Sequence, residues 1–196
     1  KRANFIASPT NPGRMKEVIE EEFIDPDWKA DGSAPLPDLD LRETWRAVKS
    51  PFTSKLGART KEAYELAFNQ FAIGNNPRYD EDAPGKPRGH IFVWDVSRAM
   101  GCEIPHFVGA RELSLGQTME WLRHEGPMRQ WTKISSTDSF RWVELGMMVV
   151  AIPKDPKLKQ IAIVAPQPEA DAPLLTGAGL IVGHLKSAEE LFGTDE

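Results

Sequence analysis

The central stretch of this chain reads Gly89-His-Ile-Phe-Val-Trp-Asp-Val-Ser-Arg-Ala-Met-Gly-Cys-Glu-Ile-Pro-His106. Its apolar residues stand at positions 92, 93, 96, 99 and 100, a spacing that places them on one stripe of an α-helix. Gly101 ends this helix, and Pro105 prevents it from resuming. Because a loop rich in proline and glycine runs directly into the helix, unpaired backbone N–H groups and the positive end of the helix dipole meet there. Such a helix start favours an anion or an activated thiolate.

Length and composition indicate a soluble globular protein. The chain has 196 residues, of which 40% are hydrophobic and 27% charged, enough for one well-packed domain. Its net charge is −5 and it has no basic tract, so we expect no nucleic-acid partner. No apolar run is long enough to span a membrane. Cys102 is the single cysteine, which excludes an intrachain disulfide and a thiolate zinc site; we expect neither a metal nor another cofactor.

The chain divides into an N-terminal arm, residues 1–40, and a domain, residues 41–196. Within the arm we expect a turn at 8–13, a short acidic helix at 14–23 and an extended linker at 25–40 that is rich in proline and aspartate. A segment with so little to bury is suited to docking on a protein partner or on a second copy of the chain. The linker is also long enough to cross the domain and cover a groove.

The domain reads as helices followed by a small antiparallel sheet, which is an α+β architecture. Besides the central helix, helices are expected at 41–48, 59–71, 113–124, 136–145 and 188–192. Strands are expected at 131–134, 147–152, 160–165 and 177–182, with a turn at 153–157 joining two of them.

Three segments carry a resemblance to a known family. Asn75-Asn-Pro-Arg-Tyr79, Ile91-Phe-Val-Trp-Asp-Val96 and Ile104-Pro-His106 resemble the NlpC-type, papain-like cell-wall amidases, over roughly residues 41–193. That family cleaves peptide bonds in peptidoglycan stems. The resemblance implies a papain-like fold, in which the central helix packs on a sheet that carries the general-base histidine. It also implies an exported or cell-envelope protein, or a component of a secreted or phage-like assembly, rather than a purely cytoplasmic one.

The family's catalytic residues are absent at the matching positions. The family's helix opens with a Cys-Asn pair, whose cysteine is the nucleophile, and this chain has Gly89 and His90 there. The histidine of the family's Gly-His-Val-Ala-Val-Val strand matches Gln160 in Lys159-Gln-Ile-Ala-Ile-Val164. Glycine offers no nucleophile, and an amide cannot accept a proton at neutral pH. We therefore expect a catalytically inactive pseudoenzyme that binds or scaffolds peptidoglycan, a muropeptide or a protein partner. Its binding groove is expected at Gly89, His90, Trp94, His106 and Gln160.

An active peptidoglycan hydrolase with a relocated nucleophile or a metal is the alternative. Cys102 and His106 are four residues apart, but the intervening Pro105 disfavours a shared helical face. His90 would stand at the mouth of the inherited groove, yet none of the four histidines shows metal-ligand spacing. Asp95 is expected to bind backbone at the helix surface, which leaves little reason to pair it with Glu103 for glycosidase chemistry.

Overall fold

The structure is a computed structural model, and it describes residues 3–9, 44–48, 50–54, 59–80, 88–166, 173–177 and 183–193. The α-helices in this part of the chain are α1 (Lys61–Asn69), α2 (Gly89–Ala99), α3 (Leu115–His124), α4 (Ser136–Glu144) and α5 (Ala188–Phe192). The strands are β1 (Ala3–Ala7), β2 (Phe107–Val108), β3 (Arg111–Glu112), β4 (Thr132–Ile134), β5 (Val149–Pro153), β6 (Ala162–Val164), β7 (Leu175–Gly177) and β8 (Gly183–Lys186). Two short 3-10 helices, η1 (Pro77–Tyr79) and η2 (Gly126–Arg129), precede α2 and follow α3.

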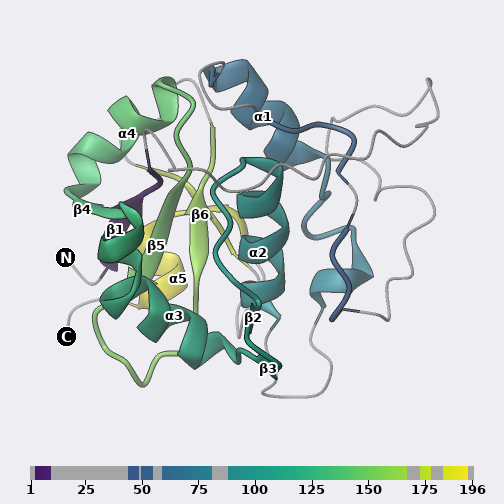
Figure 1. Cartoon of the computed structure of the whole chain (residues 1–196). Helices are drawn as coiled ribbons and strands as arrows, with labels where there is room; N and C mark the ends of the chain where they lie inside the picture. The colour runs from purple at the N-terminus through teal and green to yellow at the C-terminus, as the bar shows by residue number, and fades with distance from the viewer. Residues whose placement is uncertain are drawn as a thin grey trace.

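Six strands form one antiparallel sheet in the order β4-β1-β5-β6-β7-β8. β2 and β3 form a separate two-stranded hairpin. Helix α2 lies beside β6, α4 packs against β1 and β5, and α5 packs against β7 and β8 (Figure 1). Helices and an antiparallel sheet thus make an α+β domain, which confirms the predicted fold class.

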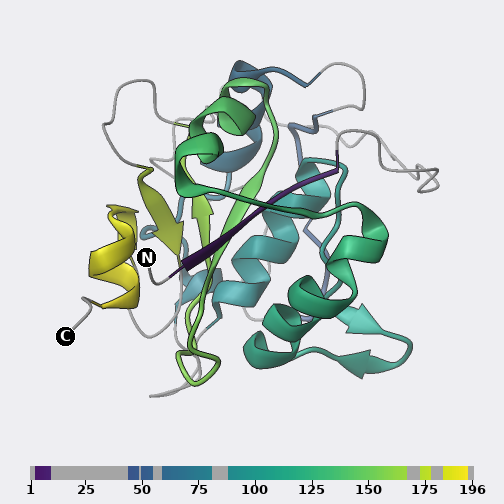
Figure 2. The same cartoon turned by 90° about the vertical axis from the view of Figure 1, so that its left-hand side faces the viewer.

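The N-terminal strand β1 lies in the interior of the sheet. Phe5 stands opposite Ile134 of β4 on one side and Ala151 of β5 on the other (Figure 2). Phe5, Ile6 and Ala7 are all buried. The prediction that residues 1–40 form an arm outside the domain is therefore wrong for residues 3–7. A five-residue segment shows little periodicity of its own, and here its pairing is set by strands more than a hundred residues away. The helix predicted at 14–23 and the linker at 25–40 lie outside the described residues.

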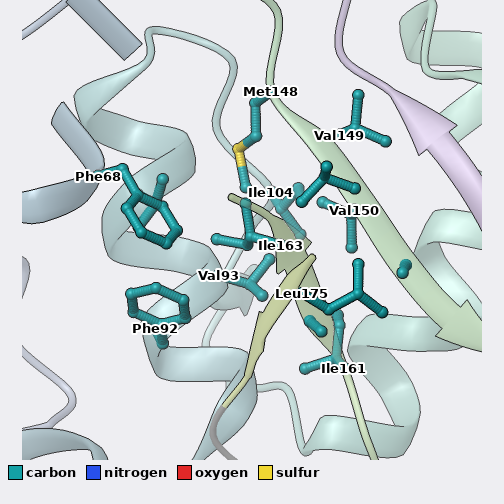
Figure 3. Close-up of a cluster of buried hydrophobic side chains, with 14 of the residues drawn as sticks. Phe68, Phe92, Val93, Ile104, Met148, Val149, Val150, Ile161, Ile163 and Leu175 are labelled. Atoms are coloured by element: carbon teal, nitrogen blue, oxygen red, sulfur yellow. The ribbon is translucent and has the colours of Figure 1, made fainter. Parts of the chain in front are cut away.

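The hydrophobic core fills the space between α2 and the sheet. Phe92 and Val93 point from α2 towards Ile163 and its neighbours on β6 and β7 (Figure 3). Phe68 of α1 extends this packing, with its ring centroid 5.9 Å from that of Phe92 in an edge-to-face arrangement. All five residues of β5 are buried, as expected for an inner strand covered on both faces. Each large apolar side chain buried here contributes about 1.5–3 kcal/mol of stabilisation relative to leaving it exposed.

Local sequence signals fix the helix ends. The Thr60 side chain caps α1, and Ser114 forms a capping box with Gln117 at the start of α3. Gly101, predicted to end the central helix, follows it with a φ of +61°. Gly146 is required by a close approach as well as by its φ of +73°, because a Cβ atom there would lie 2.6 Å from the backbone of Thr60.

Most predicted helices and strands occur where they were expected, with shifted ends. The cap of α4 is Ser135, one residue before the predicted helix start. Residues 44–48 are turn and irregular backbone, so the described part of the helix predicted at 41–48 is wrong. Of the strand predicted at 177–182, Gly177 is the last residue of β7, and residues 178–182 lie outside the described part of the chain. Within the described ranges, no helix has the length and apolar character needed to cross a bilayer.

Candidate functional site

The N-terminal end of α2 and the start of β6 lie at the same end of the domain. The Tyr64 hydroxyl donates a hydrogen bond of 2.7 Å to the carbonyl of Val164, at the far end of β6. The same tyrosine interacts electrostatically with Cys102, just beyond the far end of α2. Because α2 and β6 contact each other side by side (Figure 1), Gly89 and Gln160 both stand at the opposite end of this pair.

Three of the five predicted groove residues form a ring cluster at that end. The imidazole of His106 stacks on the indole of Trp94, with centroids 4.4 Å apart and planes tilted by 27°. The centroid of His90 lies 5.6 Å from that of His106. Phe107, the first residue of β2, places its ring edge-on to His106 at 4.7 Å. The Ile-Pro-His segment thus folds back along α2 and covers its first turns.

Both imidazoles of the cluster are neutral at pH 7. Burial lowers the pKa of His90 to about 4, and the neighbouring His106 adds to the effect. Burial also lowers the pKa of His106, while Glu112 opposes the shift. The Nε2 atom of His106 lies 2.8 Å from Oε1 of Glu112, which is an ion-pair distance but outside hydrogen-bond geometry. Nδ1 of His90 is buried without a hydrogen-bond partner among the described residues.

The predicted groove residues are covered rather than open to solvent. Gly89, Trp94, His106 and Gln160 are buried, and His90 is half-buried. A Cβ atom at Gly177 of β7 would lie 3.2 Å from Nε2 of Gln160 and 2.7 Å from the backbone oxygen of Ile161, so only glycine fits there. The Gln160 amide is therefore packed against the sheet, and it is not presented to solvent as a general base would be.

Cys102 is a core residue with an inert thiol. Its side chain is 2% exposed, and burial raises the pKa of the thiol to about 11, although Arg59 and Ser8 oppose the shift. It lies at the C-terminal end of α2, whereas His106 contacts the N-terminal end through His90. Among the described side chains, Arg59 and Ser8 interact with this thiol, and His106 lies beside His90 instead.

Asp95 is the centre of a buried ion pair, which corrects the expectation that it binds backbone at the helix surface. The Arg78 guanidinium donates to both carboxylate oxygens, at 2.7 and 3.2 Å, and the Tyr79 hydroxyl donates at 2.9 Å. Burial raises the pKa of the Asp95 carboxyl, against the opposing effect of Arg78. Glu103 instead accepts from the Trp94 indole at 2.8 Å, so the two carboxylates serve separate contacts. The Asn-Pro-Arg-Tyr and Trp-Asp motifs therefore join η1 to α2.

An open cleft of ≈ 930 Å³ lies beside the ring cluster, and most of its lining comes from the β2–β3 hairpin and the α3–η2 segment. Its lining comprises Pro9, Cys102, Glu103, Pro105, Phe107, Val108, Arg111, Leu113, Gln117, Glu120, Trp121, His124, Glu125, Met128, Arg129, Gln130 and Trp131. Phe107, Val108 and Met128 are large apolar residues with 39%, 48% and 70% of their surface exposed. This cleft could not be predicted from the sequence, because strands of two residues and an isolated exposed methionine carry no periodic signal.

No family model, curated protein or solved structure gives a significant match to this chain. In the part of the chain described by the structure, no three or more His, Cys, Asp or Glu side chains gather in a way that could hold a metal ion.

Proposed function

We propose that this chain is a catalytically inactive domain of papain-like amidase architecture that binds peptidoglycan stem peptides without cleaving them. The position of its only thiol is the observation that carries the proposal. A cysteine amidase needs a thiolate at the start of the central helix and a base facing it. In this chain Gly89 stands at that helix start, and Cys102 is buried at the other end of α2 with a pKa of about 11.

The remaining polar groups at the start of α2 also favour binding over hydrolysis. Gln160 stands where the resembling family has its base, and its amide is buried against the sheet. His90 and His106 are neutral, and neither Nδ1 of His90 nor either ring nitrogen of His106 forms a hydrogen bond with a hydroxyl or thiol of the described residues. An imidazole without a nucleophile or an activated water can supply little of the rate enhancement that peptide hydrolysis requires.

Peptidoglycan hydrolysis and binding can be measured on the same sacculi. Purified sacculi incubated with the chain should release no more amino groups than a buffer blank, while the chain should co-sediment with them. Release of amino groups that is lost in Cys102→Ala or His90→Ala would overturn the proposal and favour the hydrolase with a relocated nucleophile or a metal. Absence of both hydrolysis and co-sedimentation would remove peptidoglycan as the ligand.

A reconstitution experiment tests the inferred architecture itself. In a Cys102→Ala background, Gly89→Cys places a thiol at the start of α2, and Gln160→His adds a base at the start of β6. We expect the variant with both new residues to react with iodoacetamide at pH 7 at least about tenfold faster than the Gly89→Cys variant, because a nearby imidazole lowers a thiol pKa. Equal rates would mean that positions 89 and 160 do not face each other as the papain-like architecture requires.

A further inference from the structure

The open cleft combines an apolar wall with two cations that pair with none of the described side chains. Phe107 and Val108 of the hairpin and Met128 of η2 expose their side chains at this surface. Arg111 lies on the hairpin and Arg129 at the end of η2, so the two guanidinium groups come from different segments of the lining. Both arginines are exposed, and neither forms an ion pair or a side-chain hydrogen bond with any described residue.

The acidic side chains of the same cleft are mostly occupied. Glu120 pairs with Arg123 and with His124. Glu103 accepts from the indole of Trp94 and pairs with Arg98. Glu125 is the one lining carboxylate without such a contact among the described residues. Counted over the described residues, the lining thus holds two unpaired cations and one unpaired carboxylate, in a chain whose net charge of −5 otherwise repels anionic ligands.

We propose that this cleft binds a short acidic peptide, with an apolar or aromatic side chain on the wall formed by Phe107, Val108 and Met128, and carboxylates paired with Arg111 and Arg129. Its volume lies in the range of small-ligand pockets, roughly 300–1,000 Å³. Arginine binds carboxylates through paired N–H donors, and the apolar wall adds affinity for a large side chain. The inference rests on the proposed binding function and deepens it by locating the site away from Gly89 and Gln160.

The location also connects the cleft to the buried imidazoles. The Phe107 ring is edge-on to both His106 and Trp94, with centroids 4.7 Å and 6.5 Å away. A peptide side chain that packs on Phe107 is therefore separated from the Trp94–His106 stack only by the Phe107 ring. Binding should be visible as a chemical-shift change at the indole N–H of Trp94, even though that residue is buried.

The test uses the full chain and a fluorescein-labelled probe, the peptide Glu-Phe-Glu-Leu with a free C-terminus, in a fluorescence-anisotropy titration at low salt. A matched probe, Gln-Phe-Gln-Leu with an amidated C-terminus, has the same shape without the negative charges. We expect the acidic probe to bind at least about tenfold more tightly than the neutral one, with an affinity that falls as salt is added. NMR shift changes should concentrate at Val108, Trp121 and Met128.

Charge-reversal variants locate the site. Arg111→Glu and Arg129→Glu should each weaken binding of the acidic probe at least about tenfold and leave the neutral probe nearly unchanged. Lys154→Glu makes the same change of charge on the exposed turn after β5, outside the cleft, and should alter affinity less than about twofold.

Several outcomes would overturn the inference. Equal affinities of the two probes would show that the arginines do not bind the carboxylates of the peptide. Equal effects of all three charge-reversal variants would show that binding depends only on the overall charge of the chain. A concentration-dependent increase in mass that is lost in Arg111→Glu would identify a second copy of the chain as the occupant. No binding of the acidic probe at millimolar concentration would also reject the site. None of these results bears on amino-group release from sacculi, so failure here is distinct from failure of the proposed loss of catalysis.

Discussion

Protonation of His90 should destabilise the folded chain in a defined pH window. The unfolded chain binds this proton near the ordinary pKa of 6.5, whereas the folded chain binds it only near pH 4, because the ring is buried beside His106. Between these values the unfolded state carries more protons than the folded state. Stability therefore rises with pH across the window and is lost as the pH falls from about 6.5 towards 4.

The size of the effect follows from the two pKa values. A group with a pKa of 6.5 when unfolded and about 4 when folded lowers the free energy of unfolding by about 2 kcal/mol between pH 7.5 and pH 5. The full difference, about 3 kcal/mol, is reached only below pH 4. The pKa of His106 is lowered as well, so its contribution has the same sign.

Urea unfolding followed by tryptophan fluorescence at pH 7.5 and pH 5 measures this effect. Other groups titrate in the same range, so the His90→Asn variant isolates the imidazole, and asparagine is the residue that the resembling family has here. We expect the free energy of unfolding of the variant to fall by about 2 kcal/mol less than that of the wild type when the pH is lowered from 7.5 to 5. His124→Asn, which removes a ring whose side chain is 72% exposed, should follow the wild type. If wild type and His90→Asn lose the same free energy, the imidazole is not buried in its neutral form, and the inference is refuted.

Three further substitutions test the packing that positions the site. Asp95→Asn should lower the free energy of unfolding by about 3–5 kcal/mol, because it leaves the buried Arg78 guanidinium without a counter-charge, and urea unfolding at pH 7.5 measures it. Gly109→Ala should lower the free energy of unfolding by ~1 kcal/mol, because Gly109 has a φ above +60°. Gly146→Ala should lower it further, because Gly146 has a similar φ and its new Cβ atom would also meet the backbone of Thr60. Equal melting temperatures for the two variants would contradict this close approach. Phe5→Ala should cost about 3–5 kcal/mol if β1 is an inner strand, and a loss below ~1 kcal/mol in the same urea titration would place the N-terminal segment outside the core.

The central helix could be read directly from the sequence because its signals are local. The apolar stripe from Phe92 to Met100 has the helical period, and Gly101 marks its end without reference to any other part of the chain. The same holds for α3 and α5, whose capping serines stand three residues before Gln117 and Glu190. The absence of a nucleophile at position 89 is likewise visible in the sequence, since it depends only on which residue stands there.

The N-terminal strand and the site could not be read in this way. β1 is a strand because β4 and β5 offer it hydrogen-bonding edges, and no pattern within five residues reveals partners so distant in the chain. Asp95 is buried because Arg78 and Tyr79, which lie well before it in the chain, bind its carboxylate. Stacking of His106 on Trp94 required the chain after α2 to turn back along the helix.

By itself, the sequence determined the α+β class, the positions of most helices and strands, and the identity of the side chains at positions 89 and 160. These follow from periodicity, capping and side-chain chemistry, which act over a few residues. Only the tertiary structure decided which side chains are buried and which surface is open. It buried Gln160 and Cys102 and formed a cleft whose lining includes Arg111 and Arg129. Burial, pKa and surface shape depend on contacts between distant segments, and those contacts exist only once the chain has folded.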